Sequence, residues 1–230
     1  MGLTQFSLRY GRRLRRMLGY REEQWVRIAQ TDDWVRFLSE MHVSKLDALE
    51  ISPADGSRWR TFGFKSYLSV QFPPFDIMTQ TLDQTFDVVI AEQVFEHLQH
   101  PYFAARNVWK MLNKDGVFLI STPFLIRIHN YPGDYTRWTP AGLEAFLSVC
   151  GFDAEVKSWG NKKAVTANLE KWPTYGWGRD MTNQPQLPAV VWAFARKAAH
   201  NAAPDCAGAC HPTRCPPSAR SLGSQSNQVS

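Results

Sequence analysis

Residues 86–97, with the sequence FDVVIAEQVFEH, decide the fold of this chain. The apolar run from Val88 to Ala91 contains β-branched side chains, which predict a strand buried on both faces, as in a parallel sheet. Polarity changes abruptly at Glu92 and Gln93, where such a strand is expected to end. Ligands of open α/β sheets bind at the carboxyl ends of the strands, so these two residues mark the first place to look for a site.

Apolar runs on either side of this stretch predict the rest of the sheet. Residues 101–112 and 140–150 have helical periodicity, and residues 113–116 (Asn-Lys-Asp-Gly) supply a stop for the first of these helices. Strands and helices therefore alternate over this part of the chain, which indicates an α/β fold. The other predicted strands cover residues 46–51, 66–70, 75–78, 117–123, 153–159 and 190–195.

Three segments of the chain resemble motifs of the class I S-adenosylmethionine-dependent methyltransferases. Residues 86–97 match the FDxVxxxxVxEH sequence of that family's fourth strand, and residues 111–124 look like its MLKPGGxxxxxxP hairpin. Residues 129–139 match an H-x-x-P-x-D-[YF]-x-R-[FW]-[ST] segment found in several such enzymes. The resemblance implies a Rossmann-like, doubly wound sheet of seven strands, mostly parallel with an antiparallel last strand. It also implies methyl transfer from S-adenosylmethionine to an acceptor.

The resemblance places the cofactor loop after the first predicted strand. The usual E-x-G-x-G-x-G pattern is kept here only at Glu50 and Gly56, because Ser52 and Ala54 replace two glycines. Glycine permits a left-handed backbone, which costs other residues about 1–2 kcal/mol each. The alternative interpretation of this segment is an ordinary turn after a strand.

The family's carboxylate for the ribose hydroxyls is missing after the second strand, where Gln71 stands instead. Asp76 is the best remaining carboxylate for the nucleoside, although an Asp beside Pro73 and Pro74 is also typical of a turn. The complete predicted cofactor site is Glu50, Ser52, Gly56, Gln71, Asp76, Ala91, Glu92, Gln93 and Val94.

A loop rich in aromatic and charged residues follows the predicted strand 117–123 and is expected to cover the acceptor side of the site. His129 is the candidate that orients or deprotonates the acceptor, because a neutral imidazole is available near pH 7. A lone histidine on a loop is more often a surface or hydrogen-bonding residue. Asp134, Tyr135 and Arg137 complete the predicted substrate loop, and we expect Asp134 and Arg137 to pair or to hold the loop.

Composition suggests one domain with appendages at both ends. Residues 1–43 form a predicted helical lead-in whose first part is basic, residues 44–198 the methyltransferase domain, and residues 199–230, rich in Pro, Ser and Gly, a disordered tail. Four cysteines make no disulfide framework for a chain of 230 residues, and no segment resembles a membrane span, so a cytoplasmic protein is expected. No metal site is predicted, because Cys206, Cys210, His211 and Cys215 fit no standard spacing.

The sequence leaves the acceptor open. A small molecule, a glycan or a lipid precursor is favoured over RNA, although the net charge is +5. Two other classes of function stay open: a non-catalytic protein that keeps this fold without binding the cofactor, and an accessory protein that binds membranes or RNA through its arginine-rich start. Binding of S-adenosylhomocysteine distinguishes the first from an enzyme, and salt-dependent adsorption to RNA or anionic vesicles tests the second.

Overall fold

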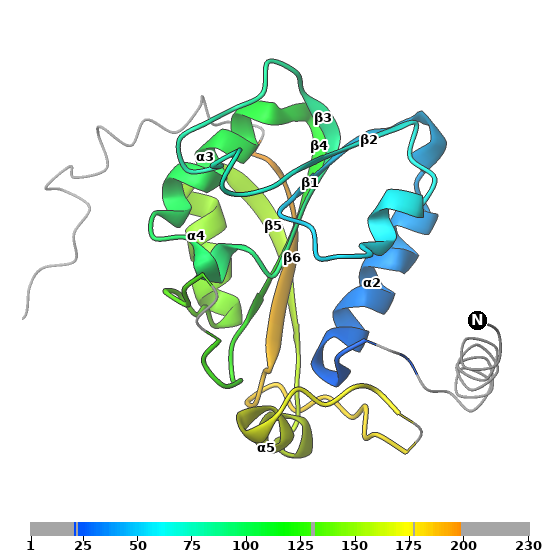
Figure 1. Cartoon of the computed structure of the whole chain (residues 1–230), viewed down its shortest axis with the longest axis vertical. Helices are drawn as coiled ribbons and strands as arrows, with labels where there is room; N and C mark the ends of the chain where they lie inside the picture. The colour runs from blue at the N-terminus through cyan, green and yellow to red at the C-terminus, as the bar shows by residue number, and fades with distance from the viewer. Residues whose placement is uncertain (1–20, 22, 130–131, 177, 199–230) are drawn as a thin grey trace, which may run out of the picture.

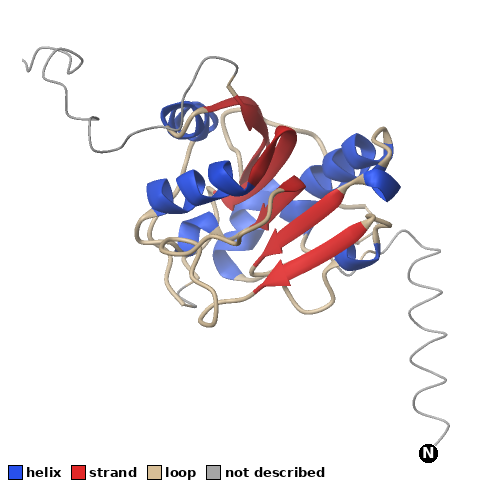
Figure 2. Cartoon of the chain, turned by 90° about the horizontal axis from the view of Figure 1, so that it is seen from above, coloured by secondary structure: helices blue, strands red, loops and turns tan. Residues whose placement is uncertain are grey.

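The computed structural model describes residues 21, 23–129, 132–176 and 178–198. The predicted basic segment up to residue 20 and the predicted tail from residue 199 lie outside these described ranges. The described chain forms a six-stranded sheet in the order β2-β1-β3-β4-β6-β5, with helices on both faces (Figures 1 and 2). The strands are β1 (Asp47–Ile51), β2 (Ser66–Val70), β3 (Phe86–Glu92), β4 (Leu112–Pro123), β5 (Phe152–Trp159) and β6 (Val190–Lys197).

Strand directions confirm the Rossmann-like, doubly wound sheet, mostly parallel with an antiparallel last strand. Strands β1 to β4 pair in parallel, whereas β6 is antiparallel to both β4 and β5. From β1 the chain moves outward to β2 on one side and then crosses to β3 on the other, so the strand order reverses between β1 and β3. Ligands of doubly wound sheets bind at the carboxyl ends of the strands beside such a reversal.

The prediction of a strand at residues 75–78 is wrong, and the described sheet has six strands rather than the seven predicted. The segment forms turns: the carboxylate of Asp76 accepts the backbone N–H of Met78 at 2.9 Å, and its carbonyl accepts the N–H of Gln80 at 2.9 Å. The preceding Pro73 and Pro74 have no N–H groups for a sheet ladder, which explains why pairing fails here. Strand β2 is therefore the edge of the described sheet.

Asp87, the second residue of the fold-deciding stretch, joins three strands at the amino end of β3. Its carboxylate accepts the backbone N–H of Asp47 at 2.9 Å and the side-chain amide of Asn113 at 2.7 Å. Asn113 already lies in β4, which begins at Leu112 directly after the preceding helix rather than at Val117 as predicted. A Cβ at Gly116 would stand 3.0 Å from the Asp87 carbonyl, so glycine there permits the close approach of β3 and β4.

Two helical layers cover the sheet (Figure 1). Helices α3 (Pro101–Met111) and α4 (Pro140–Val149) cover one face, and Leu143 and Phe146 of α4 are buried in the same core cluster as Val89 of β3. Helix α2 (Ile28–Ser39) covers the other face, where its Trp34 and Leu38 are fully buried. The remaining described helices are short: η1 (Trp25–Arg27), η2 (Val43–Lys45), η3 (Arg58–Thr61), η4 (Phe95–His97) and α5 (Lys162–Glu170).

The N-terminal helical segment is continuous in the described structure. Helix η1 leads directly into α2, and Thr31 and Asp32 lie inside α2. Thr31 is 1% exposed because the amphipathic face of the helix carries it onto the domain. Within the described ranges, no helix has both the length and the apolar character needed to cross a membrane.

Candidate functional site

Glu50, at the carboxyl end of β1, holds the following loop in place. Its side chain points to the α2 face of the sheet and is nearly inaccessible, at 2% exposure. The carboxylate accepts hydrogen bonds from the Ser57 hydroxyl at 2.8 and 2.7 Å and from the Tyr67 hydroxyl of β2. Burial raises the pKa of Glu50, and burial together with the Glu50 carboxylate raises the pKa of Tyr67 to about 12. Glu50 therefore fastens the loop after β1 to the neighbouring strand.

The loop after β1 uses two left-handed residues. Gly56 has a φ of 74°, and Ser52, at the position of a family glycine, has a φ of 49°. Ala54 does not enter that region. Placing a serine in this left-handed conformation costs about 1–2 kcal/mol.

The carboxyl end of β3 is also anchored from two sides. The Glu92 carboxylate accepts the indole N–H of Trp59 at 2.9 Å and forms an ion pair with Arg27 at 3.3 Å. Gln93 takes a left-handed φ of 57°, and its backbone N–H bonds to the Ser121 carbonyl at 3.0 Å. This turn sends the chain to the opposite face, where Val94 is buried in the core under α3 and α4.

A polar hollow of about 260 Å³ lies between the start of α2, the loop after β1 and the end of β3. It contains two arginines, Arg27 and Arg58, opposite several carboxylates. The Nε atom of Arg27 is buried and has no hydrogen-bond partner among the described residues. The residues that line the polar hollow are Glu23, Gln24, Arg27, Thr31, Glu50, Ala54, Asp55, Gly56, Ser57, Arg58 and Glu92.

The structure brings together part of the predicted cofactor site. Three of its residues, Glu50, Gly56 and Glu92, line the hollow. Gln71 is exposed after β2, and Asp76 bonds within its own turn, so neither lines it. Ser52 belongs to the same loop, whereas Ala91, Gln93 and Val94 form the strand end beside it.

Sequence reasoning missed the residues that η1 and α2 contribute to the hollow. Arg27 and Thr31 are four positions apart and therefore share a helix face, but the same spacing is common on any solvated helix. Only the docking of α2 on the sheet distinguishes Arg27 and Thr31 from residues on an ordinary solvated helix face.

On the other side of β3, the predicted substrate loop closes over η4. The backbone N–H of Tyr135 donates to the Glu96 carbonyl at 2.7 Å. The Asp134 carboxylate pairs with Arg137 and accepts the backbone N–H of His129 at 3.1 Å, while Arg137 also donates to the Phe124 carbonyl at 3.0 Å. Asp134 and Arg137 thus hold the loop by an ion pair, whereas the Tyr135 side chain is 53% exposed.

Three titratable side chains meet beneath this loop. Glu96 is fully buried, and the Nε2 atoms of His97 and His129 lie 3.6 and 3.8 Å from its Oε1 atom. Burial raises the pKa of Glu96 to about 8. Burial also lowers the pKa of His129. The positive charge of Arg27 makes a smaller contribution that lowers the pKa of both Glu96 and His129.

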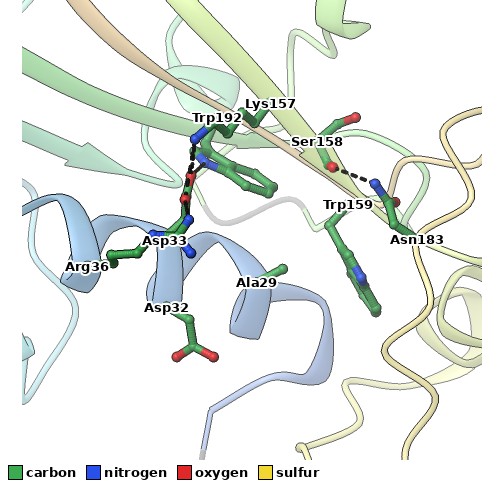
Figure 3. A pocket seen from close by; sticks show the side chains of 9 residues that line it. All are labelled: Ala29, Asp32, Asp33, Arg36, Lys157, Ser158, Trp159, Asn183 and Trp192. Atoms are coloured by element: carbon green, nitrogen blue, oxygen red, sulfur yellow. Dashed lines mark hydrogen bonds and ion pairs between the residues drawn. The ribbon is translucent and has the colours of Figure 1, made fainter.

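A second, more open hollow of about 480 Å³ lies between α2 and strands β5 and β6 (Figure 3). Its central group is Asp33, whose carboxylate accepts the indole N–H of Trp192 at 2.9 Å and pairs with Lys157 at 3.2 Å and with Arg36. Because these partners satisfy Asp33, the arrangement fits a structural contact between the helix and the sheet better than a ligand site.

Residues 19–171 match the methyltransferase domain family, and since this is well over half of the chain, the protein belongs to that family. A solved S-adenosylmethionine-dependent methyltransferase from Mesorhizobium loti shares the fold at 15% identity and a TM-score of 0.53, over 72% of this chain and 97% of that one. One from Archaeoglobus fulgidus has 12% identity and a TM-score of 0.49, over 74% and 94%. A search of curated proteins found no match.

Proposed function

We propose that this protein is an S-adenosylmethionine-dependent methyltransferase and that the amino-acid end of the donor binds in the polar hollow. One observation carries the placement: Arg27 lines the hollow, and its Nε–H has no hydrogen-bond partner among the described residues. A guanidinium group forms charge-assisted hydrogen bonds with a carboxylate, which is the group that the methionyl part of the donor carries. The family membership and the position at the reversal of strand order support the same placement.

The charges of the hollow also suit this end of the donor. A methionyl group carries one carboxylate and one ammonium group, and the hollow offers guanidinium groups from Arg27 and Arg58 and carboxylates from Glu23, Glu50 and Glu92. Its volume of about 260 Å³ is below the range usual for a whole drug-sized ligand, which fits a site for only part of the donor. The adenosine then extends toward the carboxyl end of β2, where Asp76 and Gln71 are the proposed contacts.

The acceptor approaches from the side of the loop that contains His129. Methyl transfer is a direct displacement at carbon, so positioning supplies much of the acceleration. His129 is the proposed orienting or proton-accepting group, because its lowered pKa keeps the imidazole neutral at pH 7. Small molecules, glycans and lipid precursors are the proposed acceptors. The exposed Tyr135 and Trp172 offer aromatic surface at the rim of this loop.

Calorimetric titration with S-adenosylhomocysteine tests the donor site. Arg27→Met should weaken binding about 10- to 150-fold, the loss of one charge-assisted hydrogen bond of about 1.5–3 kcal/mol. Arg106→Met is the matched control, because Arg106 lies on α3 across the sheet and should leave the affinity unchanged. Asp76→Ala should weaken binding about 5- to 150-fold if Asp76 holds the nucleoside.

A folded wild-type protein that binds neither S-adenosylmethionine nor S-adenosylhomocysteine would contradict the proposal and support the non-catalytic alternative. Equal affinities of the Arg27→Met and Arg106→Met variants would move the donor out of the polar hollow. The arginine-rich accessory function concerns residues outside the described ranges and stays a separate hypothesis.

A further inference from the structure

The buried carboxylate of Glu96 lacks the partners that such a group requires. Its side chain is 0% exposed, and neither Oε1 nor Oε2 has a hydrogen-bond partner among the described residues. An ionised carboxylate buried without compensation costs several kcal/mol, so buried charges in proteins are paired or bind metal ions. A cation bound beside Glu96 would stabilise the ionised form of this carboxylate.

Two imidazoles face the same carboxylate oxygen from different segments of the chain. His97 follows Glu96 in η4, whereas His129 comes from the substrate loop after β4, and their rings stand at 79° with centroids 4.8 Å apart. Their Nε2 atoms lie 3.6 and 3.8 Å from Oε1, which is too far for a direct hydrogen bond. Two ligands at about 2.1 Å from one tetrahedral ion are about 3.4 Å apart, so this spacing suits an ion between the three groups.

Further contacts hold the two histidines in place around Glu96. The Nδ1 atom of His97 contacts the carbonyl oxygen of Gly133, and because a carbonyl only accepts, Nδ1 carries the proton. The lone pair of His97 is then on Nε2, which faces Glu96. His129 is held by its backbone hydrogen bond to Asp134 and by the edge contact of its ring with Trp172, whose centroid is 5.5 Å away. Such second contacts fix the ring orientation of metal-ligating histidines.

We propose that Glu96, His97 and His129 bind one divalent transition-metal ion near the carboxyl end of β3. One ligand atom from each residue lies within 4.8 Å of the other two. Two imidazoles and one carboxylate are a donor set for Zn²⁺ and for Fe²⁺, Co²⁺ or Mn²⁺, and three protein ligands leave a coordination position open. The nearby charge of Arg137 is balanced by its ion pair with Asp134.

The open coordination position of the ion defines a class of methyl acceptor, and this inference about the acceptor rests on the proposed function. An acceptor hydroxyl that binds the ion loses its proton to water more readily, since a divalent ion lowers the pKa of a bound oxygen. The resulting oxygen anion forms the new O–C bond as the C–S bond of the donor breaks and the electron pair stays on sulfur. The preferred acceptors are therefore those with a hydroxyl that can coordinate a metal. Of the two roles proposed above for His129, this site assigns it the orienting one, as a ligand of the ion.

Titration of the metal-stripped full-length protein with Co²⁺ tests the site without any methyl donor. Visible absorption bands and calorimetry should show one ion per chain, displaced by Zn²⁺. Glu96→Gln and His129→Gln should each weaken Co²⁺ binding at least 100-fold. If Glu96→Gln, which changes a buried residue, fails to fold, His129→Gln still tests the site. His100→Ala, a neighbouring histidine outside the cluster, is the matched control and should bind like the wild type.

A second control concerns the tail, where Cys206, Cys210 and Cys215 offer thiolates. Replacing all three by Ser should leave the Co²⁺ site intact, and the spectrum should lack thiolate charge-transfer bands. The proposal is overturned if the wild type binds no Co²⁺, if both ligand variants bind it like the wild type, or if only the cysteine variant loses it. If Glu96→Gln loses Co²⁺ but still binds S-adenosylhomocysteine, the metal site and the donor site are shown to be separate. The metal proposal can then fail without the donor proposal failing.

Discussion

Replacing Asp33 tests whether α2 is an integral part of the domain. Asp33→Ala removes the acceptor of the Trp192 indole N–H. Because Trp192 is only 4% exposed, leaving this N–H without an acceptor costs about 1–3 kcal/mol. The lost ion pair with Lys157 adds about 0.5–1 kcal/mol, because the Lys157 side chain is 36% exposed and partly screened. The Arg36 pair adds little, since that side chain is 68% exposed. The expected loss in unfolding free energy is about 1.5–4 kcal/mol.

The matched control is Asp32→Ala, one residue earlier on the same helix. Asp32 pairs with Arg21 at 2.6 Å, but its side chain is 57% exposed, so the substitution should cost less than about 1 kcal/mol. Asp33→Asn keeps an oxygen for Trp192 and should give an intermediate loss. Urea unfolding followed by far-ultraviolet circular dichroism measures all three variants, because it reports on the helices and the sheet together.

Two results would refute this reasoning. Equal stabilities of Asp33→Ala and Asp32→Ala would show that the contacts of Asp33 do not hold the helix on the sheet. A separate early transition for α2, with the main transition unchanged, would show that the lead-in folds independently and would support a domain boundary near residue 43.

Three further predictions concern the loops. Ser52→Gly should raise the unfolding free energy by up to about 1 kcal/mol, measured by urea unfolding, because glycine relieves the left-handed strain but gains entropy when unfolded. Burial alone would raise the pKa of Glu23, but hydrogen bonds, first from Arg21, lower it to about 2. The contribution of Glu23 to the unfolding free energy is therefore present above about pH 4.5 and is lost as the pH falls toward 2. After allowance for solvent screening, the difference in unfolding free energy between the wild type and Glu23→Gln should shrink by about 1 kcal/mol over this pH range. Asp134→Asn should lower the melting temperature, since it weakens the pair with Arg137, and an unchanged melting temperature would contradict that role.

Local sequence patterns predicted most of the elements because they depend on neighbouring residues. The β-branched run at Val88 to Ala91 becomes the buried centre of β3, and β2 has the predicted bounds. The pairing of Asp134 with Arg137 was also expected, since three positions within one loop keep two charges close. The strand predicted at residues 75–78 failed because Asp76 and the two prolines favour turns over sheet pairing.

The sequence by itself determined the α/β class, and it predicted a site at the carboxyl ends of the strands and a substrate loop after the strand that ends at Pro123. Only the tertiary structure decided which side chains meet there. Arg27 lines the polar hollow because α2 docks on the sheet, and His129 lies near Glu96 because the loop after β4 closes over η4. The physical reason is that periodicity reports which face of an element is buried, whereas the meeting of distant side chains depends on strand order and on long-range packing.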